Sequence, residues 1–161
     1  MNKRPIAIAA TLLFAFIVAT AAMAADDPFA GTWKLNATKS KAPGGRLPHP
    51  RSTNVIEIQG KTVHLIADET DATGKSLHVE YTAVYDGKEY PVKQTPPSNE
   101  TYTISIKRIN PRTVEWVESI GKLTIKGRDI LSEDGKSFSR VATGKGPDGH
   151  DISVLQFFEK Q

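Results

Sequence analysis

Two charged side chains stand on apolar strand faces and are the first candidates for chemistry in this 161-residue chain. Arg140 alternates in phase with Phe138 and Ala142, and Glu118 follows Trp116 in the same way. Because alternate residues of a strand share a face, both charges should point toward an apolar interior. A buried charge is costly unless it is paired, so we expect Arg140 to meet an acid, a cavity water or a ligand.

Aromatic side chains share these inward faces. Tyr81, Tyr85 and Tyr102 lie in phase with the apolar residues of their strands, and Trp116 lies in phase with Val114. Rings with one polar atom suit the wall of a ligand cavity, where the ring packs and the polar atom can orient a ligand. We predict a ligand site of five residues: Tyr81, Tyr102, Trp116, Glu118 and Arg140.

Arg140 has several interpretations, and the sequence leaves them open. Its guanidinium could contact a ligand, could pair with Glu118, or could stack on Trp33 and so close one end of the fold. A β-bulge could instead shift the phase of the strand, so that Arg140 no longer faces inward.

One histidine comes close to a carboxylate in the expected strand pairing. If Leu65 and Val79 share an inward face, the hairpin register that pairs them sets His64 opposite Glu80 on the outer face. A His–Glu pair could act as an oriented base. Because both residues lie on a polar face, a solvated cross-strand pair is the favoured interpretation.

Other catalytic or cofactor chemistry has little support. His49, His78 and His150 lack the spacing of metal ligands, and residues 144–149 lack the spacing and following helix of a phosphate loop. The chain has no cysteine, so disulfides and thiol catalysis are excluded. We predict no catalytic residue, no metal and no cofactor, and keep an enzyme that uses polar cavity groups as an alternative.

The first 24 residues have the pattern of a secretory signal peptide. Lys3 and Arg4 precede an uncharged apolar run over residues 6–18, and Ala22-Met23-Ala24 forms an A-x-A cleavage site. The run is short for a membrane span, and an uncleaved anchor is the alternative. We expect cleavage before Ala25, a periplasmic or secreted bacterial protein, and no membrane insertion after cleavage.

Residues 25–161 should form one domain, long enough for a single core. The formal net charge of +3 includes two bases and no acid from residues 1–24, so the remainder carries about +1. Its basic residues are scattered, with no basic run and no interleaved aromatic residues. We therefore predict no nucleic-acid partner and leave the oligomeric state open.

Turn signals recur at intervals of roughly ten residues, from Gly60-Lys61 to residues 146–149. Between them lie short alternating stretches rich in Val, Ile, Thr, Tyr and Phe, and residues 42–50 form an irregular link after the first strand. No segment after the leader has a helical period. We predict an all-β fold, an antiparallel up-and-down β-barrel of about eight to ten strands, because closure removes exposed edges. A β-sandwich is the alternative.

The first strand resembles that of the calycins, which include the lipocalins and the fatty-acid-binding proteins. The resemblance rests on residues 29–35 (FAGTWKL), and it implies that Gly31 and Trp33 close one end of the barrel, often against a basic side chain from a late strand. Residues 156–160 (QFFEK) resemble the last strand of the intracellular lipid-binding proteins. The whole domain most resembles the secreted lipocalin-like proteins of bacteria, through residues 31–36, 39–40 and 85–92.

Departures from the fatty-acid-binding proteins limit what the resemblance implies. The prolines and glycines of residues 43–50 cannot form the helical lid of that family. Gln156 and Phe158 stand where its carboxylate-binding Arg and Tyr would fall. We therefore predict an exported barrel that binds a small apolar or amphipathic ligand, without the fatty-acid site. The alternatives are a barrel enzyme (an isomerase, cyclase or hydrolase) and a filled barrel that acts through its surface.

Overall fold

The computed structural model describes residues 27–146 and 149–161, so the predicted signal peptide of residues 1–24 lies outside the described residues. Its elements follow in this order: β1 (Gly31–Leu35), the 3₁₀ turn η1 (Pro43–Gly45), β2 (Arg51–Gln59), β3 (Thr62–Thr70), β4 (Ser76–Val84), β5 (Glu89–Thr95), β6 (Tyr102–Asn110), β7 (Thr113–Ile120), β8 (Leu123–Leu131), β9 (Ser137–Lys145) and β10 (Asp151–Lys160). In these two ranges, no helix combines the length and the apolar character needed to cross a bilayer.

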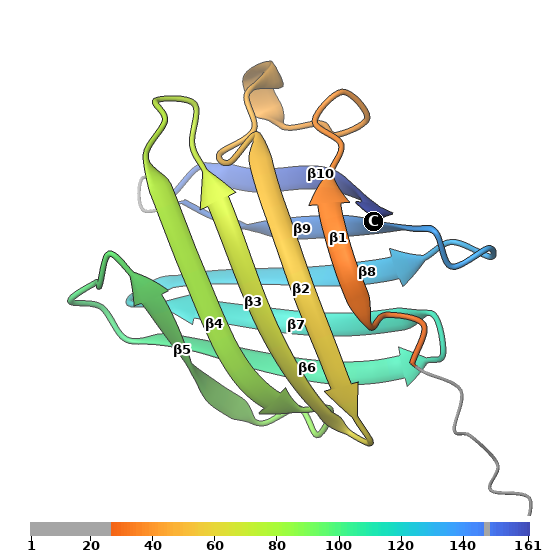
Figure 1. Ribbon diagram of the computed structural model, residues 1–161. Helices are drawn as coiled ribbons and strands as arrows, with labels where there is room; N and C mark the ends of the chain where they lie inside the picture. The colour runs from red at the N-terminus through yellow and green to blue at the C-terminus, as the bar shows by residue number, and fades with distance from the viewer. Residues whose placement is uncertain (1–26, 147–148) are drawn as a thin grey trace, which may run out of the picture.

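Each strand pairs antiparallel with the next, and β1 pairs with β10 to close the barrel. Figure 1 shows β1–β4 running steeply across the front and β6–β10 crossing behind them. The predicted all-β up-and-down barrel is confirmed, with ten strands, and the β-sandwich alternative is wrong. Closure gives both terminal strands a partner on each side, so neither presents a free edge.

The hairpin of β3 and β4 differs from the predicted register by two residues. His64 lies opposite Thr82 rather than Glu80. The difference arises because the turn between Thr70 and Ser76 is longer than expected; the Asp71 carboxylate accepts hydrogen bonds from two N–H groups of this turn. A shift by an even number of residues keeps each side chain on its predicted face.

The two ends of the barrel differ in the chain segments that cover them. Because the strands alternate in direction, residues 27–30 are at the same end as the turns β2–β3, β4–β5, β6–β7 and β8–β9, which we call the closed end. The link of residues 36–50, which includes η1, is at the opposite, open end with the other four turns. The expected irregular link is thus present at the open end, where it forms one 3₁₀ turn of three residues.

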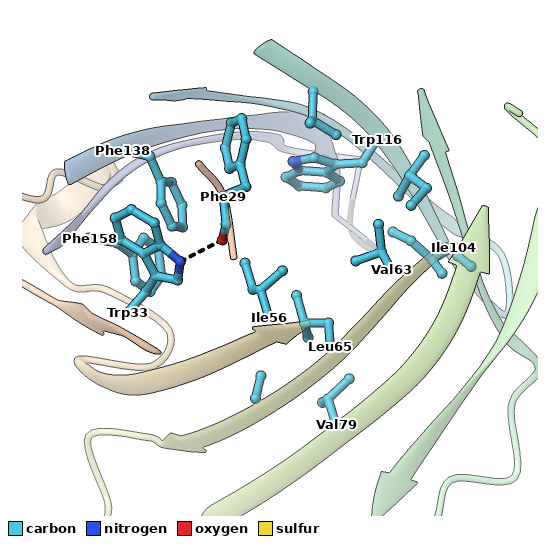
Figure 2. Close-up of a cluster of buried hydrophobic side chains, with 14 of the residues drawn as sticks. Phe29, Trp33, Ile56, Val63, Leu65, Val79, Ile104, Trp116, Phe138 and Phe158 are labelled. Atoms are coloured by element: carbon cyan, nitrogen blue, oxygen red, sulfur yellow. Dashed lines mark hydrogen bonds between the residues drawn. The ribbon is translucent and has the colours of Figure 1, made fainter. Parts of the chain in front are cut away.

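Four aromatic side chains pack together at the closed end and form the closed-end cluster: Phe29, Trp33, Phe138 and Phe158 (Figure 2). Trp33 is fully buried, and its indole N–H donates a 2.9 Å hydrogen bond to the Phe29 carbonyl. The Trp33 ring meets Phe138 edge-on with 5.0 Å between centroids, and Phe138 stacks on Phe158 at 4.7 Å. These ring contacts add to the stabilisation that comes from burying the rings.

A basic side chain of the last strand covers Trp33. The Lys160 ammonium lies 5.1 Å from the centroid of the Trp33 ring. A Cβ at Gly31 would come within 2.7 Å of the Lys160 Cε, and the φ of +131° at Gly31 disfavours any other residue. The interpretation in which Arg140 stacks on Trp33 is therefore wrong, because Lys160 takes that place.

Candidate ligand-binding cavity

A cavity of about 330 Å³ lies inside the barrel, bounded by Phe29 toward the closed end and by Pro48 toward the open end. Its wall is mostly apolar and draws on both halves of the barrel, with contributions from Ile56, Leu65, Val79, Ile104 and Trp116 (Figure 2) and from Val154. The inward side chains therefore leave space at the centre of the barrel.

All five residues predicted for the ligand site line this cavity. Tyr81 comes from β4, Tyr102 from β6, Trp116 and Glu118 from β7, and Arg140 from β9. Each is in phase with buried apolar residues of its own strand, which is why strand alternation turns it inward. The barrel thus brings side chains from four strands to one interior space.

Arg140 is paired with Asp129, a residue that the sequence analysis missed. The two lie directly opposite each other on β9 and β8. Arg140 Nε donates to Asp129 Oδ1 at 2.9 Å, and Nη2 donates to Oδ2 at 2.8 Å, so the ion pair is bidentate. Glu118, the acid considered as the partner of Arg140, does not make this pair. The available signal was that Asp129 is in phase with the buried Leu131.

Trp116 completes this group. Its indole N–H donates to Asp129 Oδ1 at 2.9 Å, and the Arg140 guanidinium lies 5.4 Å from its ring centroid. The same guanidinium lies 5.8 and 5.5 Å from the rings of Phe138 and Phe158, between the cavity and the closed-end cluster. Burial alone would lower the pKa of Arg140, but the Asp129 carboxylate outweighs it and raises the pKa, so the guanidinium stays charged.

The position of Trp116 depends on the glycine across from it. Gly127 pairs with Trp116 on β8, and a Cβ at Gly127 would lie 2.0 Å from the indole Cζ2. Glycine is therefore required here because the indole leaves no room for a side chain, and not because the backbone has an unusual conformation. Sequence reasoning missed this residue, although a glycine inside a strand is itself a sign of close approach by another group.

Glu118 lies on the cavity wall, close enough to the Tyr102 hydroxyl for that hydroxyl to favour the charged carboxylate. Burial raises the pKa of Glu118; Arg140 opposes this shift, and Glu69 adds to it. Burial raises the pKa of Tyr102 as well. Glu118 is thus a carboxyl beside a neutral hydroxyl, whereas Asp129 is paired with a guanidinium.

The other two inward tyrosines, Tyr81 and Tyr85, differ in the hydrogen bonding of their hydroxyls. Within the described part of the chain, the Tyr81 hydroxyl has no protein hydrogen-bond partner, although it lines the cavity. The Tyr85 hydroxyl accepts a 2.9 Å hydrogen bond from Arg108 Nη2, and burial raises the pKa of Tyr85 to about 12. Arg108 also pairs with Asp27, which ties residues 27–30 to β6. Tyr81 is therefore the tyrosine that is available to a ligand.

Polar groups mark the open end of the cavity. His49, from the link of residues 36–50, and Glu69, from β3, both line it. His49 Nδ1 lies 3.5 Å from Glu69 Oε2 but makes no hydrogen bond. Ser52 Oγ lies 3.5 Å from the other Glu69 oxygen and 3.2 Å from Asn54 Oδ1, and can donate to one of them at a time. A ligand that enters from the open end would meet these groups first.

The His64–Glu80 pair lies on the outer face, away from the cavity. His64 Nε2 is 3.1 Å from Glu80 Oε1, and His64 Nδ1 is 3.6 Å from Glu57 Oε2. This is a half-exposed ladder of side chains across neighbouring strands. In residues 27–146 and 149–161, no three His, Asp or Glu side chains gather in a group that could hold a metal ion.

No family model and no curated protein matches this chain. Among solved structures, the chain is similar to zebrafish ileal bile acid-binding protein complexed with cholic acid, with a TM-score of 0.53 and 11% identity over 83% of this chain and 99% of that chain. Two barrels bound to DFHBI are also similar. One is the redesigned β-barrel mFAP1, with a TM-score of 0.46 and 11% identity over 83% of this chain and 95% of that chain. The other is EF1p2_mFAP2b, with a TM-score of 0.47 and 12% identity over 83% of this chain and 94% of that chain. The likeness to the zebrafish protein identifies the fold as a calycin-like barrel.

Proposed function

We propose that the protein binds a small apolar or amphipathic molecule inside the barrel, and that it does so after export to the periplasm or the cell exterior. The observation that carries the binding proposal is the cavity of about 330 Å³, within the range of roughly 300–1,000 Å³ for small-molecule pockets. Its apolar wall would hold the body of the ligand. A few polar groups, among them Tyr81, Tyr102 and Glu118, would orient its polar end.

The distribution of side chains supports a carrier over a filled barrel. Rings fill the closed end, where Trp33 and Phe138 keep almost no accessible surface. Cavity residues such as Tyr81 and Ile152 are only half-buried. A barrel that acted only through its surface would have no use for this space. The zebrafish protein with the same fold was solved with cholic acid, which supports a small-molecule ligand for a barrel of this type.

The polar groups of the cavity favour binding over catalysis. Arg140, Asp129 and Trp116 satisfy one another, which is the arrangement of a structural ion pair. Glu118 and Tyr102 remain, and a hydroxyl beside a carboxyl suits the polar end of a bound molecule. Neither group sits beside a nucleophile in the arrangement that covalent catalysis requires.

Single-tryptophan variants test where a ligand binds. Trp33→Phe leaves Trp116 as the reporter on the cavity wall, and Trp116→Phe leaves Trp33 in the closed-end cluster. Titration with decanol should change the emission of Trp116 and leave that of Trp33 nearly unchanged. If decanol binds by calorimetry and Trp116 does not respond, the cavity is not the site. Mass spectrometry of small molecules extracted from gently purified protein would then identify the natural ligand.

Export has a separate test. Amino-terminal sequencing of the mature protein should begin at Ala25 or within a residue of it, because Ala22 and Ala24 form the cleavage pattern. Recovery of the intact chain, beginning at Met1, in the membrane fraction would contradict this part of the proposal and leave the binding proposal intact.

A further inference from the structure

We propose that the cavity selects an amphipathic amine, with the ammonium group at Glu118 and the apolar body deeper in the barrel, and that it discriminates against carboxylates. The inference deepens the proposed binding function and rests on it. Three observations carry it: the pairing of the positive charge in the cavity, the surroundings of Glu118, and the carboxylate at the open end.

The first observation is that the cavity offers no uncompensated positive charge. Of the described residues that line it, Arg140 and His49 are the ones that can carry such a charge. Asp129 already neutralises Arg140 through two hydrogen bonds, and Arg140 lies against the rings of Phe138 and Phe158. Glu69 lies beside His49 at 3.5 Å. A ligand carboxylate would therefore enter a space in which each positive charge already faces an acid.

The second observation concerns Glu118. Its neighbours across the strands are Ile104 on β6 and Ile125 on β8, so the carboxyl stands in an apolar stretch of wall. In the described residues, the neutral Tyr102 hydroxyl lies close to it, and it makes no ion pair. A half-buried carboxylate without a paired cation is unfavourable, and a ligand ammonium would supply the missing charge.

The number of acceptors near Glu118 fits an ammonium group. An ammonium carries three N–H donors and no acceptor. The Glu118 carboxylate and the hydroxyl oxygens of Tyr102 and Tyr81 all face the cavity, and the Tyr81 hydroxyl has no protein partner within residues 27–146 and 149–161. Burial raises the pKa of Glu118, and the Arg140 guanidinium, which already pairs with Asp129, only partly opposes this shift; a ligand ammonium would oppose it further.

The third observation is the charge at the open end. Glu69 lines the cavity near the link that carries His49, and Gln156, opposite Arg140 on β10, adds no charge. Counted together, Glu69, Glu118 and Asp129 outnumber the permanent positive charge of Arg140. The potential inside the cavity therefore favours a cation over an anion.

Three probes with one ten-carbon chain test the inference: decylamine, decanol and decanoate, each at neutral pH and below its aggregation concentration. Binding is measured by calorimetry on the wild-type protein and by Trp116 emission in the Trp33→Phe variant. We expect decylamine to bind about tenfold more tightly than decanol, and decanoate to bind more weakly than both. Glu118→Gln should lower the affinity for decylamine about tenfold and change that for decanol by less than about twofold.

Glu115→Gln is the matched control, because Glu115 lies on the same strand but pairs with Arg128 on the outer face. It should leave all three affinities unchanged. Decanoate binding as tightly as decylamine would overturn the inference while the proposed function stands. If Glu69→Gln, and not Glu118→Gln, removed the preference, the assignment to Glu118 would be wrong. If none of the three probes bound, the proposed function itself would fail.

Discussion

Trp33 and Trp116 are both buried on inward faces of the same barrel, yet their surroundings differ in kind. Trp33 packs among the rings of Phe29, Phe138 and Phe158, and its N–H bonds to a backbone carbonyl. Trp116 bonds to the Asp129 carboxylate and faces an open cavity. At the closed end, apolar packing fills the space. In the cavity, Arg140, Asp129 and Trp116 satisfy one another along the wall and leave the space free.

This difference predicts where the stability of the barrel comes from. Burial of a large aromatic side chain contributes several kcal/mol, whereas a buried ion pair roughly balances its own desolvation. We therefore expect the closed-end cluster to supply stability. The Arg140–Asp129 pair instead fixes the shape and charge of the cavity, and it becomes costly only when one partner is removed.

Trp33→Ala tests the closed end and should have the largest effect. The substitution leaves a void among three rings and removes the hydrogen bond to Phe29, so it should lower the free energy of unfolding by about 3–5 kcal/mol. Urea denaturation followed by circular dichroism measures the change. Trp33→Phe, which keeps a ring, should cost less. A loss below about 1 kcal/mol for the alanine variant would show that the cluster does not hold the barrel closed.

Asp129→Asn tests the ion pair and should cost about 3 kcal/mol, because it leaves the Arg140 guanidinium half-buried without a counter-charge. The same variant should bind decanoate more tightly than the wild type, since the freed guanidinium can receive a carboxylate. Glu115→Gln breaks the exposed pair with Arg128 and should change stability by less than about 1 kcal/mol. Equal costs for the two variants would remove the distinction between the inner and outer pairs.

Gly127→Ala tests the wall of the cavity and should cost about 1–3 kcal/mol, because the new Cβ overlaps the Trp116 indole and forces it to move. The emission of Trp116 should shift in the absence of any ligand. In a Trp116→Ala background the same glycine substitution should cost much less, and a double-mutant cycle measures the coupling. Additive costs would mean that the two residues are not in contact.

Glu118→Gln and Glu80→Gln compare an inner with an outer carboxyl and should have the smallest effects on the free energy of unfolding. The two effects should change with pH in opposite directions. Burial raises the pKa of Glu118. As pH rises above about 4.5, this carboxyl therefore ionises in the unfolded chain before it ionises in the folded protein, and the folded protein loses stability. The hydrogen bond from His64 lowers the pKa of Glu80, so its contribution is present above that pH and is lost on acidification.

Stability measured from about pH 2 to pH 8 checks both signs, because the Glu80 contribution changes below about pH 4.5 and the Glu118 contribution changes above it. As pH rises, the stability of the Glu118→Gln variant relative to the wild type should increase, and that of the Glu80→Gln variant should decrease. If the relative stabilities of the two variants changed with pH in the same direction, the predicted difference between the pKa shifts of Glu118 and Glu80 would be contradicted.

The sequence predicted the barrel because its local signals agree with one another. Turn residues at regular intervals and strict alternation between them specify hairpins, and alternation placed Tyr81, Glu118 and Arg140 on the inner face before any register was known. An error of two residues in the β3–β4 register did no harm, since faces repeat every two residues.

Contacts that depend on which residues of two paired strands lie opposite each other could not be predicted in the same way. Arg140 needed an acid, but the choice of Asp129 over Glu118 depends on the register of β8 with β9. Lys160 covers Trp33 only because β10 lies beside β1. Gly127 was passed over because its role depends on which side chain the neighbouring strand places against it.

The pairing of β1 with β10 also bears on how the chain reaches its folded state. Lys160 Nζ contacts the Pro28 carbonyl across 132 positions of the chain, so the closing contacts are among the longest in range that the domain makes. Contacts of this kind form slowly, because loop closure must come first. Until β10 is in place, β1 and β9 would each lack a neighbour on one side. During that interval the unfinished sheet is open to pairing with another copy of the chain, and aggregation competes with closure.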